Sequence, residues 1–195
     1  MTLGVSNVRI LAVALLSLAL LAPAGHAGIS LIDTRVALGA DNSIDWGQLG
    51  SPLQYSITSP QNVLDALGNL DAVSDSGSLA RLDEGTGWHG MFLVGQHLLW
   101  NNDNHNPIVV AFLHPVFGFA VQAMNDAPGP FRATVSLFNG ANNLANFFVD
   151  GVNVYNAENG TAPVLGALDT VAEITSIRII AHTTEIINGL VTECR

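Results

Sequence analysis

Three groups of oxygen-bearing side chains are dense enough to suggest a calcium site. Calcium takes six to eight hard oxygens from carboxylates, amides and backbone carbonyls. The groups are Asp41, Asn42 and Asp45; Asn101, Asn102, Asp103 and Asn104; and Asp150, Asn153, Asn156 and Glu158. None has EF-hand spacing, and Asn and Asp also favour turns because their side chains bond the local backbone. We predict a structural Ca²⁺ ion at the first group, where an early acidic loop lies beside Trp46.

Tryptophan beside polar loop residues is the second chemical signal. A pyranose ring stacks its C–H face on an indole while its hydroxyls bond planar polar groups. Trp88 lies in the glycine-rich segment Asp83–Gly90, so among the tryptophans it is the one most expected to face solvent. Trp46 and Trp100 are instead expected to plug the core of the sandwich, as tryptophans in such folds often do. The predicted ligand-binding residues, for an extracellular glycan, are Trp88, His89 and Asp83.

Signals for catalysis are weaker. Asp83 and Glu84 are adjacent, so on a strand their carboxylates would point to opposite faces instead of facing each other across a glycosidase cleft. The sequence has no G-x-S-x-G motif and no cysteine except Cys194. The histidines after residue 27 lack the short paired spacing of zinc or cupin sites; they are His89, His97, His105, His114 and His182. We therefore expect a protein that is not an enzyme, with a hydrolase as the third choice.

The elements that must position these residues are short strands. Phe117–Ala123 and Phe131–Leu137 place an apolar residue at every second position, which is the period of a half-buried strand. Turn residues fill Asn125–Pro130 between them, and Asn139-Gly140 precedes a third run at Leu144–Val149. We expect the three runs to form one antiparallel sheet with an apolar face that a second layer covers.

The rest of the chain repeats this pattern. Further strands are expected at Ile29–Leu38, Leu53–Ile57, Leu79–Leu82, Ile108–Leu113, Pro163–Leu168, Ile174–Ala181 and Glu185–Val191. Pro60–Asp71 has apolar residues at near-helical spacing, which indicates a loop or one short helix. About nine or ten short strands, with turn signals roughly every 8 to 12 residues, predict an all-β fold. The expected class is an antiparallel β-sandwich, jelly-roll or galactose-binding-like.

Residues 1–27 are typical of a secretory signal peptide. Arg9 supplies a positive charge, Ile10–Leu21 is apolar, and Gly25 and Ala27 stand at the −3 and −1 positions of a cut before Gly28. The apolar run is shorter than the roughly 20 residues of a membrane span. A cut after Ala24, or a retained N-terminal anchor, is the alternative. We expect residues 28–195 to form one secreted domain with no membrane contact after cleavage.

Charge and cysteine content limit the partners. The chain has 16 acidic residues against 6 basic ones, none of them lysine. This balance argues against nucleic acid and anionic membranes, which attract basic patches. With Cys194 alone, no intramolecular disulfide is possible, so packing must hold the fold. The sequence leaves the oligomeric state open.

Six motifs occur in an order that resembles a known group of proteins. They are DWGQLG (45–50), GTGWHG (85–90), PIVVAF (107–112), PVFG (115–118), GPFRAT (129–134) and VLGA (164–167). Over about Asp33–Val191 the chain is similar to uncharacterised secreted bacterial proteins with jelly-roll-like sandwich domains, many of which carry a PEP-CTERM sorting tail. This sequence ends in VTECR, without a Pro-Glu-Pro motif or apolar tail. The resemblance implies a fold and secretion, with free release in place of sorting, and it implies no activity.

These observations predict a secreted, non-catalytic binding module, with a glycan ligand and a structural calcium ion. The alternative is a purely structural extracellular or envelope protein that binds no small ligand.

Overall fold

The computed structural model describes residues 28–195 except 76, 78, 102–105, 188–189 and 194–195. The predicted signal peptide, most of the 101–104 group, His105 and Cys194 lie outside the described residues. The strands are β1 (Ser30–Ile32), β2 (Gln54–Ile57), β3 (Gln61–Leu64), β4 (Leu70–Ser74), β5 (Leu79–Asp83), β6 (His97–Trp100), β7 (Ile108–Val116), β8 (Gly118–Gln122), β9 (Gly129–Asn139), β10 (Asn142–Asn153), β11 (Val164–Leu168), β12 (Ile174–Ile187) and β13 (Leu190–Glu193). Two short helices, α2 (Arg35–Leu38) and the 3₁₀ helix η2 (Trp46–Leu49), complete the described elements.

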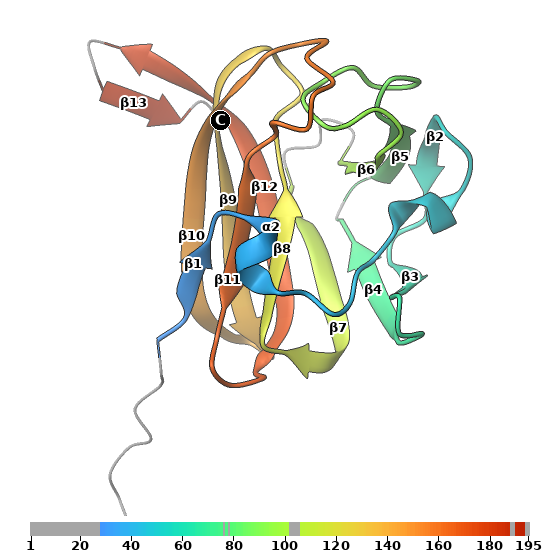
Figure 1. The fold of residues 1–195 in the computed structure, drawn as a ribbon, viewed down its shortest axis with the longest axis vertical. Coiled ribbons are helices and arrows are strands. Elements are labelled where there is room, and N and C mark those ends of the chain that lie inside the picture. Colours follow the sequence, from blue (N-terminus) through green and yellow to red (C-terminus); the bar gives the residue numbers. More distant parts are fainter. Residues whose placement is uncertain (1–27, 76, 78, 102–105, 188–189, 194–195) are drawn as a thin grey trace, which may run out of the picture.

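The strands form an antiparallel β-sandwich, which confirms the predicted all-β class (Figure 1). One layer is a large sheet in the order β10-β9-β12-β7-β4-β3, with β13 paired to the far end of β12. The sheet β1-β11-β8 packs against one part of it, and the sheet β2-β5-β6 lies beside β3 and β4 (Figure 1). No helix in the described part of the chain is long and apolar enough to cross a membrane.

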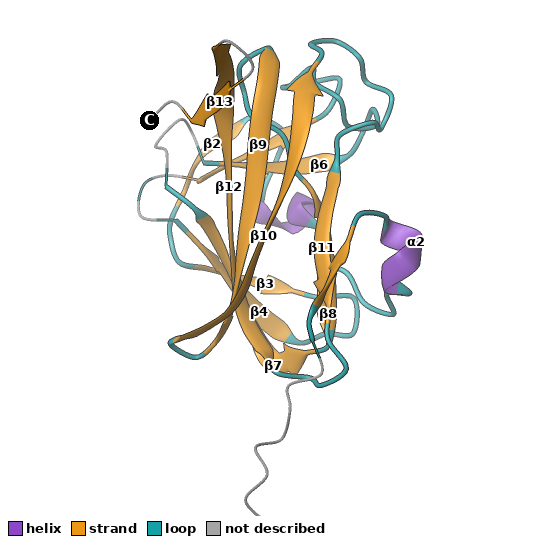
Figure 2. Ribbon diagram, turned by 90° about the vertical axis from the view of Figure 1, so that its left-hand side faces the viewer, coloured by secondary structure: helices purple, strands orange, loops and turns teal. Residues whose placement is uncertain are grey.

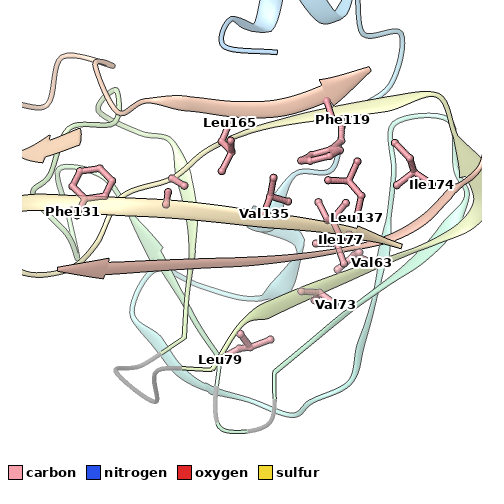
Figure 3. Close-up of a cluster of buried hydrophobic side chains, with 14 of the residues drawn as sticks. Val63, Val73, Leu79, Phe119, Phe131, Val135, Leu137, Leu165, Ile174 and Ile177 are labelled. Carbon is pink, nitrogen blue, oxygen red and sulfur yellow. The ribbon is translucent and has the colours of Figure 1, made fainter. Parts of the chain in front are cut away.

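The core lies between the large sheet and the three-stranded sheet β1-β11-β8. Along β9 the predicted alternation holds, since Phe131, Ala133, Val135 and Leu137 are all fully buried. Leu165 of β11 is buried opposite them (Figure 3). The other labelled core residues are Val63, Val73, Leu79, Phe119, Ile174 and Ile177 (Figure 3). Packing of these side chains replaces the disulfides that the sequence lacks.

The prediction that Phe117–Ala123 and Phe131–Leu137 share a sheet is wrong. β8 pairs with β11, whereas β9 pairs with β10 and β12, so the two runs lie in facing layers. The connection is held by buried Asn153, whose Nδ2 donates to the carbonyls of residues 125, 126 and 127 at 3.0, 3.3 and 3.1 Å. Strand alternation shows which side chains share a face, but two facing strands and two paired strands have the same alternation.

The prediction of a loop or helix over Pro60–Asp71 is also wrong, because the segment folds as the β3–β4 hairpin. Leu64 pairs with Leu70 across the turn. Asp65 makes the turn: its Oδ1 accepts from the N–H groups of Leu67 and Asn69 at 3.0 and 2.7 Å. The apolar spacing is misleading because Leu64, Leu67 and Leu70 are exposed and only Val63 is buried.

The first expected strand, Ile29–Leu38, is shorter than predicted. β1 ends at Ile32, and Thr34 caps the following helix α2 by accepting from the N–H of Ala37 at 3.3 Å. Gly39 ends that helix in the left-handed conformation, with φ of 61°. A hydroxyl cap and a glycine stop therefore divert the chain from the sheet within one turn.

Candidate functional site

A cleft of about 1240 Å³ opens between the two smaller sheets. Its walls include residues of β6 and β8, and its floor includes inner residues of β7 and β12. The segment 38–46 and the β3–β4 turn close its rim. Among the described strands β6 pairs only with β5, and β8 only with β11, so the cleft lies between two free strand edges. A concavity with mixed apolar and polar walls is the usual form of a small-molecule site, and this one is larger than most.

All three tryptophans of the sequence line this cleft. Trp46 begins η2, Trp88 lies in the loop after β5, and Trp100 ends β6; each is half-buried. Phe92 and Phe112 add aromatic surface. The predicted core role of Trp46 is partly realised, because it packs against the core cluster while also lining the cleft.

A hydrogen-bond network at Gln122 links the two walls. Gln122 ends β8, and its Oε1 accepts from Arg35 Nη2 at 2.7 Å and from Gln96 Nε2 at 3.4 Å. Its Nε2 donates to the carbonyls of Gly160 and Ala162 at 3.1 and 2.9 Å. One amide thus ties α2, the loop before β6 and the loop before β11 to the edge of β8.

A second polar network fixes η2 against β6. His97 Nδ1 lies 2.5 Å from Asp45 Oδ1, and Asp45 Oδ1 also accepts from the N–H of Gly47 at 2.9 Å. The bond from Gly47, followed by the bond from His97, holds the pKa of Asp45 below its ordinary value. His97 Nε2 is 3.9 Å from Asp83, which pairs with buried Arg81 at 2.6 Å. The imidazole therefore lies between two carboxylates.

Two polar atoms of cleft-lining residues are buried without a hydrogen-bond partner among the described residues. They are Nε1 of Trp88, a donor, and Oδ1 of Asn125, an acceptor. Asn125 Nδ2 is engaged, because it donates to Thr183 Oγ1 at 3.1 Å. Buried polar atoms in native proteins are nearly always paired with protein, water or ligand. Trp88 Nε1 lies against Gly90, where an added Cβ would be 2.4 Å from it, so this donor is enclosed by the protein.

Of the three predicted ligand-binding residues, only Trp88 lines the cleft. His89 Nδ1 contacts Glu158 Oε1 at 2.5 Å outside the lining. Asp83 contributes to the network around His97 but does not line the cleft itself. Sequence neighbours on the loop after β5 therefore face different surroundings.

Glu84 is fully buried next to this loop. Its Oε1 accepts from the N–H of Gly90 at 2.6 Å, while Oε2 makes no hydrogen bond in the described structure. Burial raises the pKa of Glu84, the N–H groups of Gly90 and Phe92 oppose that rise, and the nearby Glu158 adds to it. Because Glu84 does not line the cleft, its raised pKa serves no ligand there.

The predicted calcium ligands have separate neighbours. Asn42 Nδ2 donates to Asp65 Oδ2 at 2.5 Å, and its Oδ1 accepts from the N–H of Ser43. Asp45 contacts His97, as described above, and Asp41 is exposed at the rim of the cleft. Among the described residues, no three His, Cys, Asp or Glu side chains are grouped closely enough to hold a metal ion.

Members of the third acidic group are also engaged separately. Asp150 binds Arg132, Asn153 holds the β8–β9 connection, and Glu158 contacts His89. In the second group, Asn101 Nδ2 donates to the carbonyl of Asn106 at 2.9 Å. Both patterns match the turn-forming alternative for Asn and Asp.

Few signals in the sequence indicate the residues that shape the cleft. Gln96 and Gln122 are 26 positions apart, and Asn125 belongs to a segment that reads only as a turn. The one usable signal was the set of tryptophans. Comparison of the chain with protein-family models, curated proteins and solved structures gives no match.

Proposed function

We propose that this protein is an extracellular, non-catalytic module that binds a carbohydrate in the cleft between β6 and β8. The observation that supports the proposal is the presence of all three tryptophans on one cleft that also carries planar amides. Indole faces accept the C–H face of a sugar ring, and amides bond its hydroxyls.

The carboxylates of the cleft favour binding over hydrolysis. A glycosidase needs an acid with a raised pKa facing a second carboxylate. Asp65 lines the cleft, and although partial burial acts to raise its pKa, hydrogen bonds from Asn69, Asn42 and Leu67 hold the pKa below its ordinary value. Asp71 accepts from the N–H of Leu113 at 2.8 Å. These groups are occupied in holding the structure.

The negative charge of the chain favours neutral glycans over acidic polysaccharides as ligands. With a formal net charge of −10, the protein repels sulfated and uronic-acid polysaccharides at low ionic strength. We therefore expect neutral glycans, with the pyranose stacked on Trp88 or Trp100.

Intrinsic fluorescence offers a direct test, because all three tryptophans line the cleft. Titration with neutral oligosaccharides chosen from a glycan array is expected to shift the emission and saturate. Trp88→Ala and Trp100→Ala are each expected to weaken binding by about 2- to 12-fold, since stacking contributes about 0.5–1.5 kcal/mol per ring. Phe148→Ala, an exposed aromatic residue outside the cleft, is the matched control and should bind as the wild type does.

Two outcomes would contradict the proposal. One is the absence of any array signal or emission shift with neutral glycans. The other is binding that survives both tryptophan substitutions in variants whose circular dichroism shows an intact fold. The first outcome would favour the structural alternative.

A further inference from the structure

The layer that covers the large sheet is divided into two small sheets. In Figure 2, β8 and β11 stand beside the long strands β9, β10 and β12, in the facing layer. The edge strands β6 and β8 do not pair with each other, and the cleft opens between them. The apolar face of a sheet needs a covering layer that keeps it from water. In the described structure, the cleft takes the place of that layer between β6 and β8.

The floor of the cleft is an aliphatic strip of the large sheet. Ile179 of β12 lies opposite Ile108 of β7 in the strand pairing, and both are half-buried. Two positions along, Ile177 lies opposite Val110, and both are buried. Residues directly opposite each other in an antiparallel pair point to the same face of the sheet. Since all four line the cleft, as does half-buried Ala181, the bottom of the cleft is aliphatic.

The wall on the β8 side extends this apolar surface. Val121 of β8 and Met124, two residues after the end of β8, are half-buried, pack against the core and line the cleft. Leu99 of β6 does the same on the opposite wall. The volume of about 1240 Å³ exceeds the roughly 300–1,000 Å³ of an ordinary small-molecule pocket. A sugar ring stacked on one tryptophan therefore fills only part of the cleft.

The charged side chains that line the cleft are mostly acidic. Among the lining residues that the structure describes, Arg35 is the only arginine or lysine, against the carboxylates of Asp41, Asp65, Asp71 and Asp126. Three histidines also line the cleft, and a histidine is charged only when protonated. A carboxylate or phosphate head group would therefore enter predominantly negative surroundings. A neutral polar head group avoids that repulsion.

We propose that the ligand of this cleft is an amphiphilic glycoside, which is a neutral sugar that carries an alkyl or acyl chain. The inference rests on the carbohydrate binding proposed above and adds the chemical class of the group attached to the sugar. The sugar stacks on a tryptophan of the cleft, while the chain lies on the aliphatic strip between β6 and β8. Each CH₂ group buried there is expected to tighten binding by up to about fourfold.

Isothermal titration calorimetry with two series of glycosides tests the inference. The ligands are methyl, butyl, hexyl and octyl β-glucosides and β-galactosides, each used below the concentration at which it forms micelles. We expect the octyl glycoside of the preferred sugar to bind at least about 100-fold more tightly than its methyl glycoside.

Two substitutions in the apolar part of the cleft locate the chain. Ala181→Phe fills part of the strip, and Val121→Thr keeps the shape of the side chain but adds a hydroxyl group. We expect the ratio of octyl to methyl affinity to fall at least about tenfold in Ala181→Phe and about threefold in Val121→Thr, with methyl glycoside binding unchanged. Val152→Thr, the same substitution at an exposed site outside the cleft, is the matched control and should keep the wild-type ratio.

The outcomes separate this inference from the proposed function. Equal affinity for methyl and octyl glycosides overturns the chain and leaves carbohydrate binding intact. A chain-length dependence that is unchanged in both cleft variants, each shown by circular dichroism to be folded, also overturns it. Octanol or octyl sulfate binding as tightly as the octyl glycosides contradicts recognition of a neutral sugar. Absence of binding by every glycoside contradicts both proposals.

Discussion

His97 on β6 and Asp45 at the start of η2 are joined by a contact of 2.5 Å between Nδ1 and Oδ1. Gly47 makes the approach possible, because a Cβ there would lie 2.4 Å from His97 Nδ1. The contact fixes Trp46 at the rim of the cleft, since Trp46 follows Asp45 directly.

Asp45→Ala should therefore loosen η2. The substitution removes both the N-cap of η2 and the partner of His97, and a lost cap costs about 1 kcal/mol. For a domain of this size that corresponds to a fall in Tm of about 2–4 °C. Thermal unfolding followed by circular dichroism measures it. Asp41→Ala, an exposed acid four residues earlier, is the control, and an equal loss there would contradict the role of the cap.

The pH dependence of this contact has a definite sign. The pKa of Asp45 is lowered in the folded state, so the folded state holds fewer protons than the unfolded state near the unfolded value of 3.8. The contribution of ionised Asp45 to the free energy of unfolding is present above pH 3.8, and it is lost as the pH falls through the lower pKa of the folded state. The stability difference between wild type and Asp45→Asn should shrink between pH 5 and pH 2. A stability difference that grows as the pH falls would contradict a lowered pKa of Asp45 in the folded state.

Glu84→Gln is expected to stabilise the protein at pH 7. Glutamine keeps the acceptor for the N–H of Gly90 and avoids a buried charge with an unpaired oxygen, which costs about 1–3 kcal/mol. Because burial raises the pKa of Glu84, the wild type gains stability as the pH falls from 7 towards the unfolded value of 4.5, and the advantage of glutamine declines. Denaturant unfolding at pH 7 and pH 4 measures both effects. Asp33→Asn, a surface change of equal charge, serves as control.

Gln122→Leu should open the end of the cleft. It removes the acceptor shared by Arg35 and Gln96 and leaves the carbonyls of Gly160 and Ala162 without their donor. We expect a loss of about 1–3 kcal/mol in denaturant unfolding, together with weaker binding of any neutral glycan that the wild type binds. Gln54→Leu, where the lost bond reaches only the carbonyl of Ser56, should cost far less.

Leu165→Ala tests the packing between the two layers. Leu165 is fully buried on β11 opposite β9, and truncation of such a leucine costs about 2–5 kcal/mol. Leu67→Ala removes the same atoms at an exposed turn and should be nearly neutral. Equal effects in chemical denaturation would place the core elsewhere.

Calcium is expected to leave the melting temperature unchanged. The side chains of Asn42 and Asp45 already accept hydrogen bonds from backbone N–H groups, and they contact Asp65 and His97 respectively. A ligand that binds only the folded state raises its stability. Melts in 2 mM calcium and in EDTA should therefore coincide, and a higher Tm in calcium would support the predicted ion.

Part of the candidate site could be inferred from the chain alone. Trp88 was predicted to face solvent because glycine and polar residues mark a surface loop, and the structure has it half-buried in the wall of the cleft. His97, Gln122 and Asn125 carried no such signal. Each of them is held at the cleft by a hydrogen bond to a residue that is distant in the sequence.

Strand β9 and its buried face could be predicted without coordinates, because a period of two places Phe131, Val135 and Leu137 on one side of any extended chain. The single cysteine likewise requires that packing stabilise the fold without an internal disulfide. The folded molecule was needed to show that β8 faces β9 and does not pair with it, and that β6 and β8 leave a cleft between them. The reason is physical: alternation is a local property of the backbone, whereas the choice of strand partner depends on long-range packing and on the turns that connect the layers.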